Sequence, residues 1–255
     1  MKYISTLRLL FQLFFIEFIL YHAIMFLNGA SYKNCESFCP MGAVETLSLF
    51  IKNGKFPCAV NELNYSIFFV IIVLTILFKR VFCSWVCPFG AINEFISSAR
   101  SYFSAYDKFT GTVMKFLHSV RYFILTAIIY FTYTNYDLVF RPYCPYFTAF
   151  GTHGHTTYFF SYFVLINVLI ATLIVKLGFC RILCPFGAFL ALFNFKTVLK
   201  IYRDSDKCVN CGICDKSCNF EIKVSEKEVV NSPECVMCMN CISKCPKAGA
   251  LKIGF

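Results

Sequence analysis

Residues 208–218 read Cys-Val-Asn-Cys-Gly-Ile-Cys-Asp-Lys-Ser-Cys, and residues 235–246 read Cys-Val-Met-Cys-Met-Asn-Cys-Ile-Ser-Lys-Cys-Pro. Both stretches have the spacing C-x2-C-x2-C-x3-C, and matching cysteines lie 27 residues apart. In this pattern three cysteines bind one [4Fe–4S] cubane and the fourth binds the other cluster. The expected ligand sets are Cys208, Cys211, Cys214 and Cys245 for the first ferredoxin site, and Cys218, Cys235, Cys238 and Cys241 for the second.

The twin pattern indicates a small domain of the bacterial ferredoxin type, with an α+β fold, at residues 200–255. A zinc interpretation would need two close cysteine pairs at each site, which this spacing matches less well. Cys218 is followed by Asn219, where the pattern often has proline. That departure affects the chain around one cluster and leaves the ligands unchanged.

The 199 residues before this tail have the composition of a membrane protein. The whole chain of 255 residues is 58% hydrophobic and 15% charged, and its mean hydropathy is +0.64. Soluble globular chains are about 45–50% apolar and about 25% charged, so the composition argues against an ordinary soluble enzyme. Fifteen basic and seven acidic residues precede Lys200, which gives this part +8 of the total charge of +10. We attribute that excess to loops beside anionic lipid, and we expect no nucleic-acid partner.

Four apolar runs predict four transmembrane helices, which makes residues 1–199 a mainly α membrane domain. A span needs about 20 apolar residues, so the second and third runs are short unless they continue across Lys79–Arg80 and Asp137. Snorkelling of Lys79 and Arg80 would permit the first of these extensions. The runs are Leu9 to Asn28, Tyr65 to Phe78, Tyr122 to Tyr136 and Tyr158 to Leu177.

The distribution of basic residues predicts that both termini and the ferredoxin domain are cytoplasmic. With the N-terminus inside, ten Lys or Arg fall in inner segments and four in outer ones. The first run is long for a signal peptide and no A-x-A-like cleavage site follows it, so we expect an uncleaved helix. The predicted location is therefore the cytoplasmic (inner) membrane, with multiple spans.

A second cysteine motif, C-x3-C-P-[MF]-G-A, occurs three times in the membrane part. On the predicted topology, two copies meet at the inner face and form the inner quartet of Cys83, Cys87, Cys180 and Cys184. The third copy joins Cys58 and Cys144 at the outer face, which gives the outer quartet of Cys35, Cys39, Cys58 and Cys144. Four thiolates are the ligand set of a cubane, so the chain would hold two to four [4Fe–4S] clusters. Free thiols at the inner quartet and disulfides at the outer one stay open as alternatives.

Helix one carries polar residues within its apolar run. Glu17 and His22 are candidate catalytic residues, because an intramembrane carboxylate marks a functional site by default. Glu17 and Tyr21 are one helical turn apart and share a face. Quinol oxidation releases protons that Glu17, with His22, would accept. The alternative is a protonated Glu17 that only packs against a neighbouring helix.

The chain resembles the NapH/NosR-type membrane polyferredoxins, on its four apolar runs, its two inner C-x3-C-P motifs and its twin ferredoxin motif. The resemblance implies an electron-transfer subunit of a quinol dehydrogenase complex, with quinone, a periplasmic or other outer-face redox protein and a cytoplasmic donor as candidate partners. The third motif at Cys35/Cys39, with Cys58 and Cys144, departs from the NapH pattern. It suggests that electrons leave the protein at the outer face. A second interpretation is a polyferredoxin-type copper reductase that serves oxidase assembly. It predicts a copper-binding site on one face, and Met25 and Met41 are few methionines for such a site on the outer face.

The short second and third runs suggest that both membrane quartets sink toward the midplane. Runs of 14 and 15 residues cover only about 21–23 Å at 1.5 Å per residue. The segment from Pro40 to Ile51 is apolar enough to return as a short helix protected by protein. Local bilayer thinning, with a quinone bridging the clusters, is the alternative.

Overall fold

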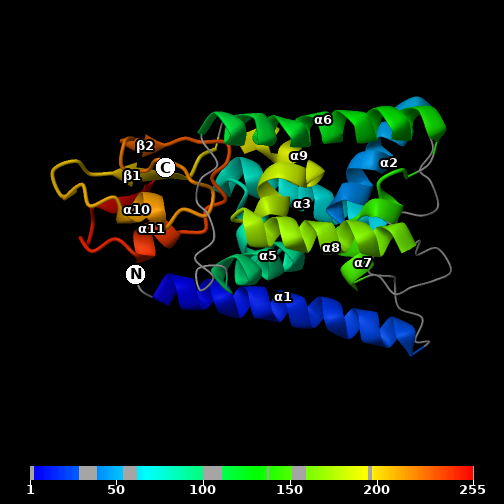
Figure 1. The fold of residues 1–255 in the computed structure, drawn as a ribbon, viewed down its shortest axis with the longest axis horizontal. Helices are drawn as coiled ribbons and strands as arrows, with labels where there is room; N and C mark the ends of the chain where they lie inside the picture. Colours follow the sequence, from blue (N-terminus) through cyan, green and yellow to red (C-terminus); the bar gives the residue numbers. More distant parts are fainter. Residues whose placement is uncertain are drawn as a thin grey trace. The chain divides into compact units, whose positions relative to one another are not determined.

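A computed structural model describes residues 3–28, 39–53, 62–99, 111–136, 138–150, 159–194 and 197–254. Cys35 and Cys58, two members of the outer quartet, lie outside these residues. Figure 1 shows the helices and strands of the chain. The described chain divides into two compact units. Unit 1 comprises residues 1–15, 71–91 and 190–255, and unit 2 comprises residues 16–70 and 92–189.

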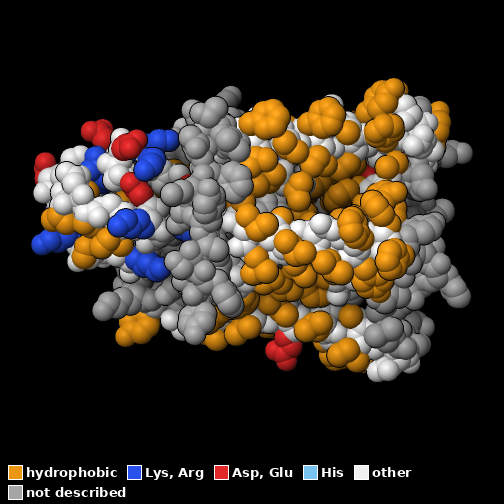
Figure 2. Space-filling view, viewed as in Figure 1, with side chains coloured by type: hydrophobic (Ala, Val, Ile, Leu, Met, Phe, Trp, Pro, Cys, Tyr) orange, Lys and Arg blue, Asp and Glu red, His pale blue; other side chains and the backbone are white. Residues whose placement is uncertain are grey.

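Each predicted apolar run forms a helix. These helices are α1 (Tyr3–Leu27), α3 (Glu62–Phe78), α6 (Gly111–Asn135) and α8 (Phe159–Ile174). Among the described residues, two helices contain windows long and apolar enough to cross a membrane, Tyr3–Met25 and Phe116–Asn135. Figure 2 shows hydrophobic side chains over the exposed surface of the long helices, whereas charged side chains gather on the strand-containing part. The four-span topology therefore stays a prediction.

Shorter helices follow the long ones along the chain, and four of them begin at a proline that follows a cysteine. These four are α2 (Pro40–Asn53), α5 (Pro88–Ala99), α7 (Pro145–Phe150) and α9 (Pro185–Phe193). Proline suits the first helical position, because its fixed φ fits the helix and its missing N–H would have no partner there. The remaining helical segments are α4 (Val81–Trp85), the 3-10 turn η3 (Arg141–Tyr143) and the π-helical turn η4 (Phe179–Leu183).

The structure corrects two expectations about the short middle runs. The third run lies within α6, which starts at Gly111 and has 25 residues, so this helix is not short. The second run ends at Phe78 because Lys79 takes the left-handed conformation, with φ at 62°. Lys79 and Arg80 do not snorkel: their side chains are 0% and 1% exposed.

Unit 1 contains the ferredoxin-like domain, which has the expected α+β fold. Strands β1 (Lys200–Arg203), β2 (Val229–Val230) and β3 (Leu251–Gly254) form an antiparallel sheet in the order β2-β1-β3. The short helices α10 (Ile213–Lys216) and α11 (Asn240–Ser243) each contain a central cysteine of one ferredoxin motif. The sheet starts at Lys200, and the chain before it is tied to the end of α3 by a hydrogen bond from the Leu199 N–H to the Leu77 carbonyl (3.0 Å).

Unit 2 is held together by buried polar contacts as well as apolar packing. Helix α2 packs on α6, and α7 packs on α8. The Thr172 hydroxyl of α8 donates to Oδ1 of Asn93 in α5 at 2.6 Å, and both side chains are fully buried. Glu45 of α2 is 2% exposed, and its Oε1 accepts hydrogen bonds from the Thr132 hydroxyl (3.0 Å) and from the Phe140 N–H (2.9 Å). One carboxylate oxygen thus joins α2, α6 and the segment that leads to Cys144.

We predict that Glu45→Ala lowers the free energy of unfolding by about 1–3 kcal/mol, because the Thr132 hydroxyl and the Phe140 N–H lose their acceptor. Thermal unfolding of the detergent-solubilised protein measures this loss. The matched control is Glu17→Ala, since Glu17 is an exposed carboxylate that makes no hydrogen bond with any described residue. Equal unfolding temperatures for the two variants would contradict the role given to Glu45.

Candidate iron–sulfur sites

Two cavities in the ferredoxin-like domain each have one predicted cysteine set in their walls. The first, about 390 Å³ including its open mouth, is lined by Cys208, Cys211, Cys214 and Cys245. The second, about 370 Å³ on the same basis, is lined by Cys218, Cys235, Cys238 and Cys241. The cysteines surround a cavity and do not converge on one point: no three described His, Cys, Asp or Glu side chains are placed to hold a single metal ion. This arrangement fits a cubane, which is larger than one ion.

The two cysteine loops have the same backbone conformation, which matches the repeat in sequence. The second and fourth residues after the leading cysteine are left-handed in both loops: Asn210 and Gly212 in the first, Met237 and Met239 in the second. In each loop the N–H of the earlier left-handed residue donates to the sulfur of the leading cysteine, Cys208 or Cys235. The N–H groups of Asn240 and Ile242 donate in the same way to Cys238 and Cys241. Backbone donors aimed at sulfur stabilise a thiolate ligand and tune a bound cluster.

The carbonyls of the second loop accept hydrogen bonds from side chains outside the ferredoxin motif. Each carbonyl from residue 235 to residue 238 has such a donor. The pairs are Asn194 to Cys235 (3.1 Å), Ser84 to Val236 (2.6 Å), Trp85 to Met237 (3.2 Å) and Arg8 to Cys238 (3.0 Å). Gln12 of α1 donates in turn to the Ser84 carbonyl at 2.9 Å, so α1 and α4 are joined within the same network.

The two ferredoxin sites differ in exposure. Cys211 is exposed, whereas Cys235 and Cys241 are buried. Burial raises the pKa of Cys238 to about 12 and also raises the pKa of Cys241, so these thiols stay protonated at neutral pH until a metal displaces the proton. A side-chain hydrogen bond from Arg203 lowers the pKa of Cys208. The two sites therefore differ in the exposure of their cysteines, with one exposed cysteine at the first site and two buried cysteines at the second.

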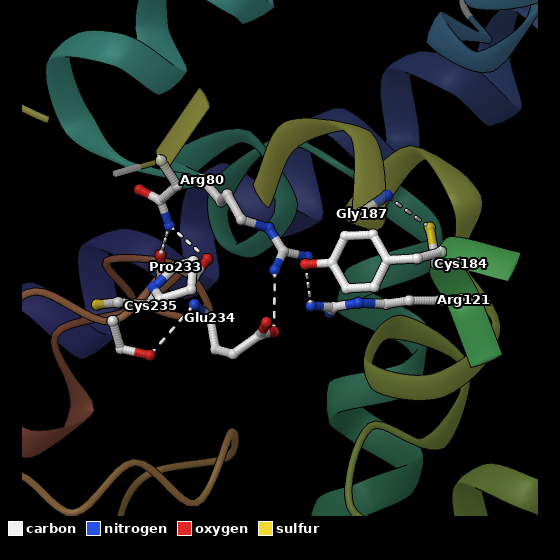
Figure 3. Close-up of polar contacts among 10 residues, drawn as sticks. Arg80, Arg121, Cys184, Gly187, Pro233, Glu234 and Cys235 are labelled. Carbon is white, nitrogen blue, oxygen red and sulfur yellow. Dashed lines mark hydrogen bonds and ion pairs between the residues drawn. The ribbon is translucent and has the colours of Figure 1, made fainter. Parts of the chain in front are cut away.

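Buried basic side chains lie beside the second site. The Arg80 guanidinium pairs with Glu234, with Nη1 to Oε2 at 3.3 Å (Figure 3), and lies 5.7 Å from the ring centroid of Phe220. Burial lowers the pKa of the Lys79 ammonium, and the nearby Lys200 lowers it as well, whereas negative charge at Cys235 raises it. An anionic cluster would raise the pKa of Lys79 further, because opposite charges favour each other's ionised forms.

Four cysteines of the helical part occupy the same local position, immediately before the proline that starts a helix: Cys39, Cys87, Cys144 and Cys184. The Gly90 N–H donates to the Cys87 sulfur and the Gly187 N–H to the Cys184 sulfur, each at 3.3 Å (Figure 3 shows the second bond). The N–H groups of Gly42 and Phe147 donate to Cys39 and Cys144. A helix N-terminus supplies free N–H groups and favours negative charge, so each motif is suited to hold a thiolate.

The inner quartet is divided between the two units. Cys83 and Cys87 belong to unit 1, where α4 ends and α5 begins, and Cys180 and Cys184 belong to unit 2, in and after η4. In both copies the second cysteine N–H bonds to the carbonyl five residues earlier, at 2.9 Å for Cys87 and 2.8 Å for Cys184. The two copies thus share one local fold, and their union in a single site stays a prediction.

The described half of the outer quartet comes together in unit 2. The side chains of Cys39 and Cys144 are hydrogen-bonded to each other, although 105 residues separate them in sequence. The Asn64 side chain donates to the Cys39 carbonyl at 3.0 Å, which fixes the start of α2 against α3. Met41, one of the methionines considered for copper, is 3% exposed.

The two candidate catalytic residues lie on α1 in unit 2. Glu17 has an exposed side chain, as does Tyr21 one turn later, so both are accessible from outside the protein. His22 contacts its own helix: its Nδ1 lies 2.9 Å from the Phe18 carbonyl, and its ring lies 4.3 Å from the Phe18 ring. Their catalytic roles stay predictions.

Comparison with known proteins agrees with this arrangement. A family of 4Fe-4S binding domains matches residues 61–102 and 157–202, and a 4Fe-4S dicluster domain matches residues 200–246. The first match contains the inner quartet and the second contains all eight ferredoxin cysteines, whereas the outer quartet lies outside both.

Named relatives identify the family. The electron transport protein YccM of Escherichia coli is 30% identical over 85% of this chain and 62% of its own length, so the match spans less than two thirds of YccM. Protein MJ0750 of Methanocaldococcus jannaschii is 34% identical over 70% of this chain and 74% of its own. The ferredoxin-type protein NapH of Haemophilus influenzae is 26% identical over 69% of this chain and 63% of its own. The chain belongs to the NapH/NosR-type polyferredoxins. No solved structure matches it significantly.

Sequence reasoning about this polyferredoxin missed several buried charged residues. Glu45, Arg121 and Arg181 are 2%, 0% and 1% exposed and belong to unit 2, while Lys79 and Arg80 belong to unit 1. The available signal for two of them was a position beside a cysteine motif: Glu45 lies six residues after Cys39, and Arg181 follows Cys180 directly. For Arg181, a motif predicted to bind an anionic cluster was a reason to expect an electrostatic role, whereas Arg121 has no such motif beside it in the sequence.

We predict that Gly90→Ala depletes iron at the inner quartet. A Cβ at Gly90 would lie 2.5 Å from the Cys83 carbonyl oxygen, so Cys83 would move relative to Cys87, and such overpacking costs about 1–3 kcal/mol. Gly42→Ala is the matched control at the same motif position, because its nearest neighbour, Asn64 Nδ2, is 4.0 Å away. Iron analysis of both purified variants measures the difference, and equal iron content would contradict the prediction.

Proposed function

We propose that this chain is a membrane electron-transfer subunit that relays electrons between the quinone pool or a cytoplasmic donor and a redox partner on the outer face. The observation that carries the proposal is the pair of cysteine-lined cavities, one with an exposed cysteine and one with two buried cysteines. The second site is hydrogen-bonded to α1 and to α4, which contains the first inner-quartet residue, Cys83. The proposed route runs through the first site, the second site and the cysteines of the inner quartet.

The chain's own residues would do three things in this route. The eight ferredoxin cysteines and the inner quartet would hold [4Fe–4S] clusters, which supply one-electron transfer when bound. The backbone N–H groups aimed at the sulfurs would stabilise the added negative charge. The side chains that bind the carbonyls of residues 235–238 would keep the second ferredoxin site at a fixed separation from Cys83 and Cys87 within unit 1.

The number of clusters gives a direct test. Anaerobically purified protein should contain about 16 iron atoms and 16 acid-labile sulfides per chain if every quartet holds a cubane, and about 12 if the outer quartet does not. About 8 would leave only the ferredoxin sites and would contradict a relay into the helical part. Cys39→Ser and Cys144→Ser identify the outer contribution, since they remove iron only if that quartet binds a cluster.

Quinol oxidation is the proposed reaction at the helical part. Each quinol gives up two electrons, which pass singly to the clusters, and two protons, which need an acceptor. Glu17 is our candidate acceptor because its carboxylate is exposed on α1, where a lipid-soluble quinol can reach it, and Tyr21 lies beside it.

We predict that Glu17→Gln slows reduction of the clusters by quinol and leaves reduction by dithionite unchanged. Glutamine keeps the size and polarity of the side chain but removes the titratable proton. Stopped-flow absorbance of the clusters measures both rates. The control is Glu94→Gln, which makes the same change from carboxylate to carboxamide on a different helix, α5. Unchanged quinol kinetics across pH would assign Glu17 to packing alone.

A further inference from the structure

Lys79 is a buried cation placed between the helical part and the ferredoxin-like domain of unit 1. It follows α3 and precedes α4, and its side chain is 0% exposed. Its Nζ makes no hydrogen bond to any residue in the described part of the chain. A buried ammonium without a partner is costly, so its presence needs a compensating negative charge.

Lys79 lies close to the second ferredoxin site, because the next residue, Arg80, pairs with Glu234 at 3.3 Å and Glu234 directly precedes the buried Cys235. Burial and the nearby Lys200 lower the pKa of Lys79, whereas negative charge at Cys235 raises it. Two neighbouring cations already have other contacts: Arg80 pairs with Glu234, and Arg8 donates to the Cys238 carbonyl. Lys79 differs from both, since its buried ammonium has no hydrogen-bond partner among the described residues.

We propose that the Lys79 ammonium is the fixed counter-charge of the second ferredoxin site and raises the reduction potential of the cluster bound there. The inference deepens the proposed function and rests on it, because it requires a cubane at that site. Reduction adds one electron and hence one negative charge to the cluster. A cation in a poorly solvated position stabilises the reduced form more than the oxidised form, and salt screens it little.

The chain offers a comparison at the first ferredoxin site. Arg203 is hydrogen-bonded to Cys208 and is the cation there, but it lies in a partly exposed position on β1. Water and salt reduce the effect of such a charge. Neutralising Lys79 and neutralising Arg203 should therefore move different clusters, and only the Arg203 effect should fade at high salt.

The test is an anaerobic redox titration of the full-length protein, followed by electron paramagnetic resonance. Lys79→Met should lower one midpoint potential by an amount equal to at least a tenfold change in the reduction equilibrium, about 59 mV for one electron. Arg203→Met should lower the other ferredoxin midpoint by less. Lys79→Arg should keep the wild-type value, and Lys227→Met, which removes an exposed lysine of the same domain, should move neither.

Iron content separates a failure of this inference from a failure of the proposed function. If wild-type protein lacks iron at the eight ferredoxin cysteines, the proposed function itself is wrong. If iron is intact and Lys79→Met leaves both midpoints unchanged, only the counter-charge is overturned.

A second neutral variant, Lys79→Gln, covers the case in which Lys79→Met lowers cluster content. Iron loss in both neutral variants with retention in Lys79→Arg supports the counter-charge, because the charge then holds the cluster. Equal iron loss in all three variants overturns it and assigns Lys79 to packing.

Discussion

The row of hydrogen bonds on the carbonyls of residues 235–238 is the interaction on which unit 1 depends. A loop that turns its N–H groups toward cysteine sulfurs has to satisfy its carbonyls elsewhere, because a buried carbonyl without a donor is costly. Here Asn194, Ser84, Trp85 and Arg8 supply the donors. The same bonds that complete the cluster loop therefore fix it to α1 and α4, and the second ferredoxin site is part of the helical framework as much as of its own domain.

The helical part repeats one local structure around its cysteines. At each Cys-Pro pair a helix begins at the proline, and the cysteine sulfur lies near free N–H groups of the first turn. This explains why Cys144 resembles the three motif copies although its sequence lacks the preceding cysteine and the Gly-Ala. It also explains how Cys39 and Cys144 meet: both stand at helix starts in unit 2, and Glu45 ties α2 to the segment before Cys144.

Charge placement follows from the same chemistry. Clusters with four thiolates are anions, so a bound cluster would stabilise nearby buried cations, which burial alone disfavours. Lys79, Arg80 and Arg8 are buried around the second ferredoxin site, and the predicted cytoplasmic bias of Lys and Arg accounted for them only as loop charges. A basic residue beside a cysteine motif can therefore reflect either the membrane topology or the charge of a nearby cluster. Composition alone does not distinguish the two explanations.

The sequence by itself determined what depends on local spacing. The two groups of four ferredoxin cysteines, the strands that begin at Lys200 and the helices of the four apolar runs all follow from residue spacings and turn residues a few positions apart. The structure has these elements, and each group of cysteines lines one cavity, whereas their roles as cluster ligands stay predictions. The tertiary structure decided what depends on contacts across many residues. Packing of distant segments buries Lys79, pairs Cys39 with Cys144 and brings Arg8 to the Cys238 carbonyl, 230 residues away in the sequence. Such contacts produce no periodic pattern in the sequence, so they could not be predicted from it.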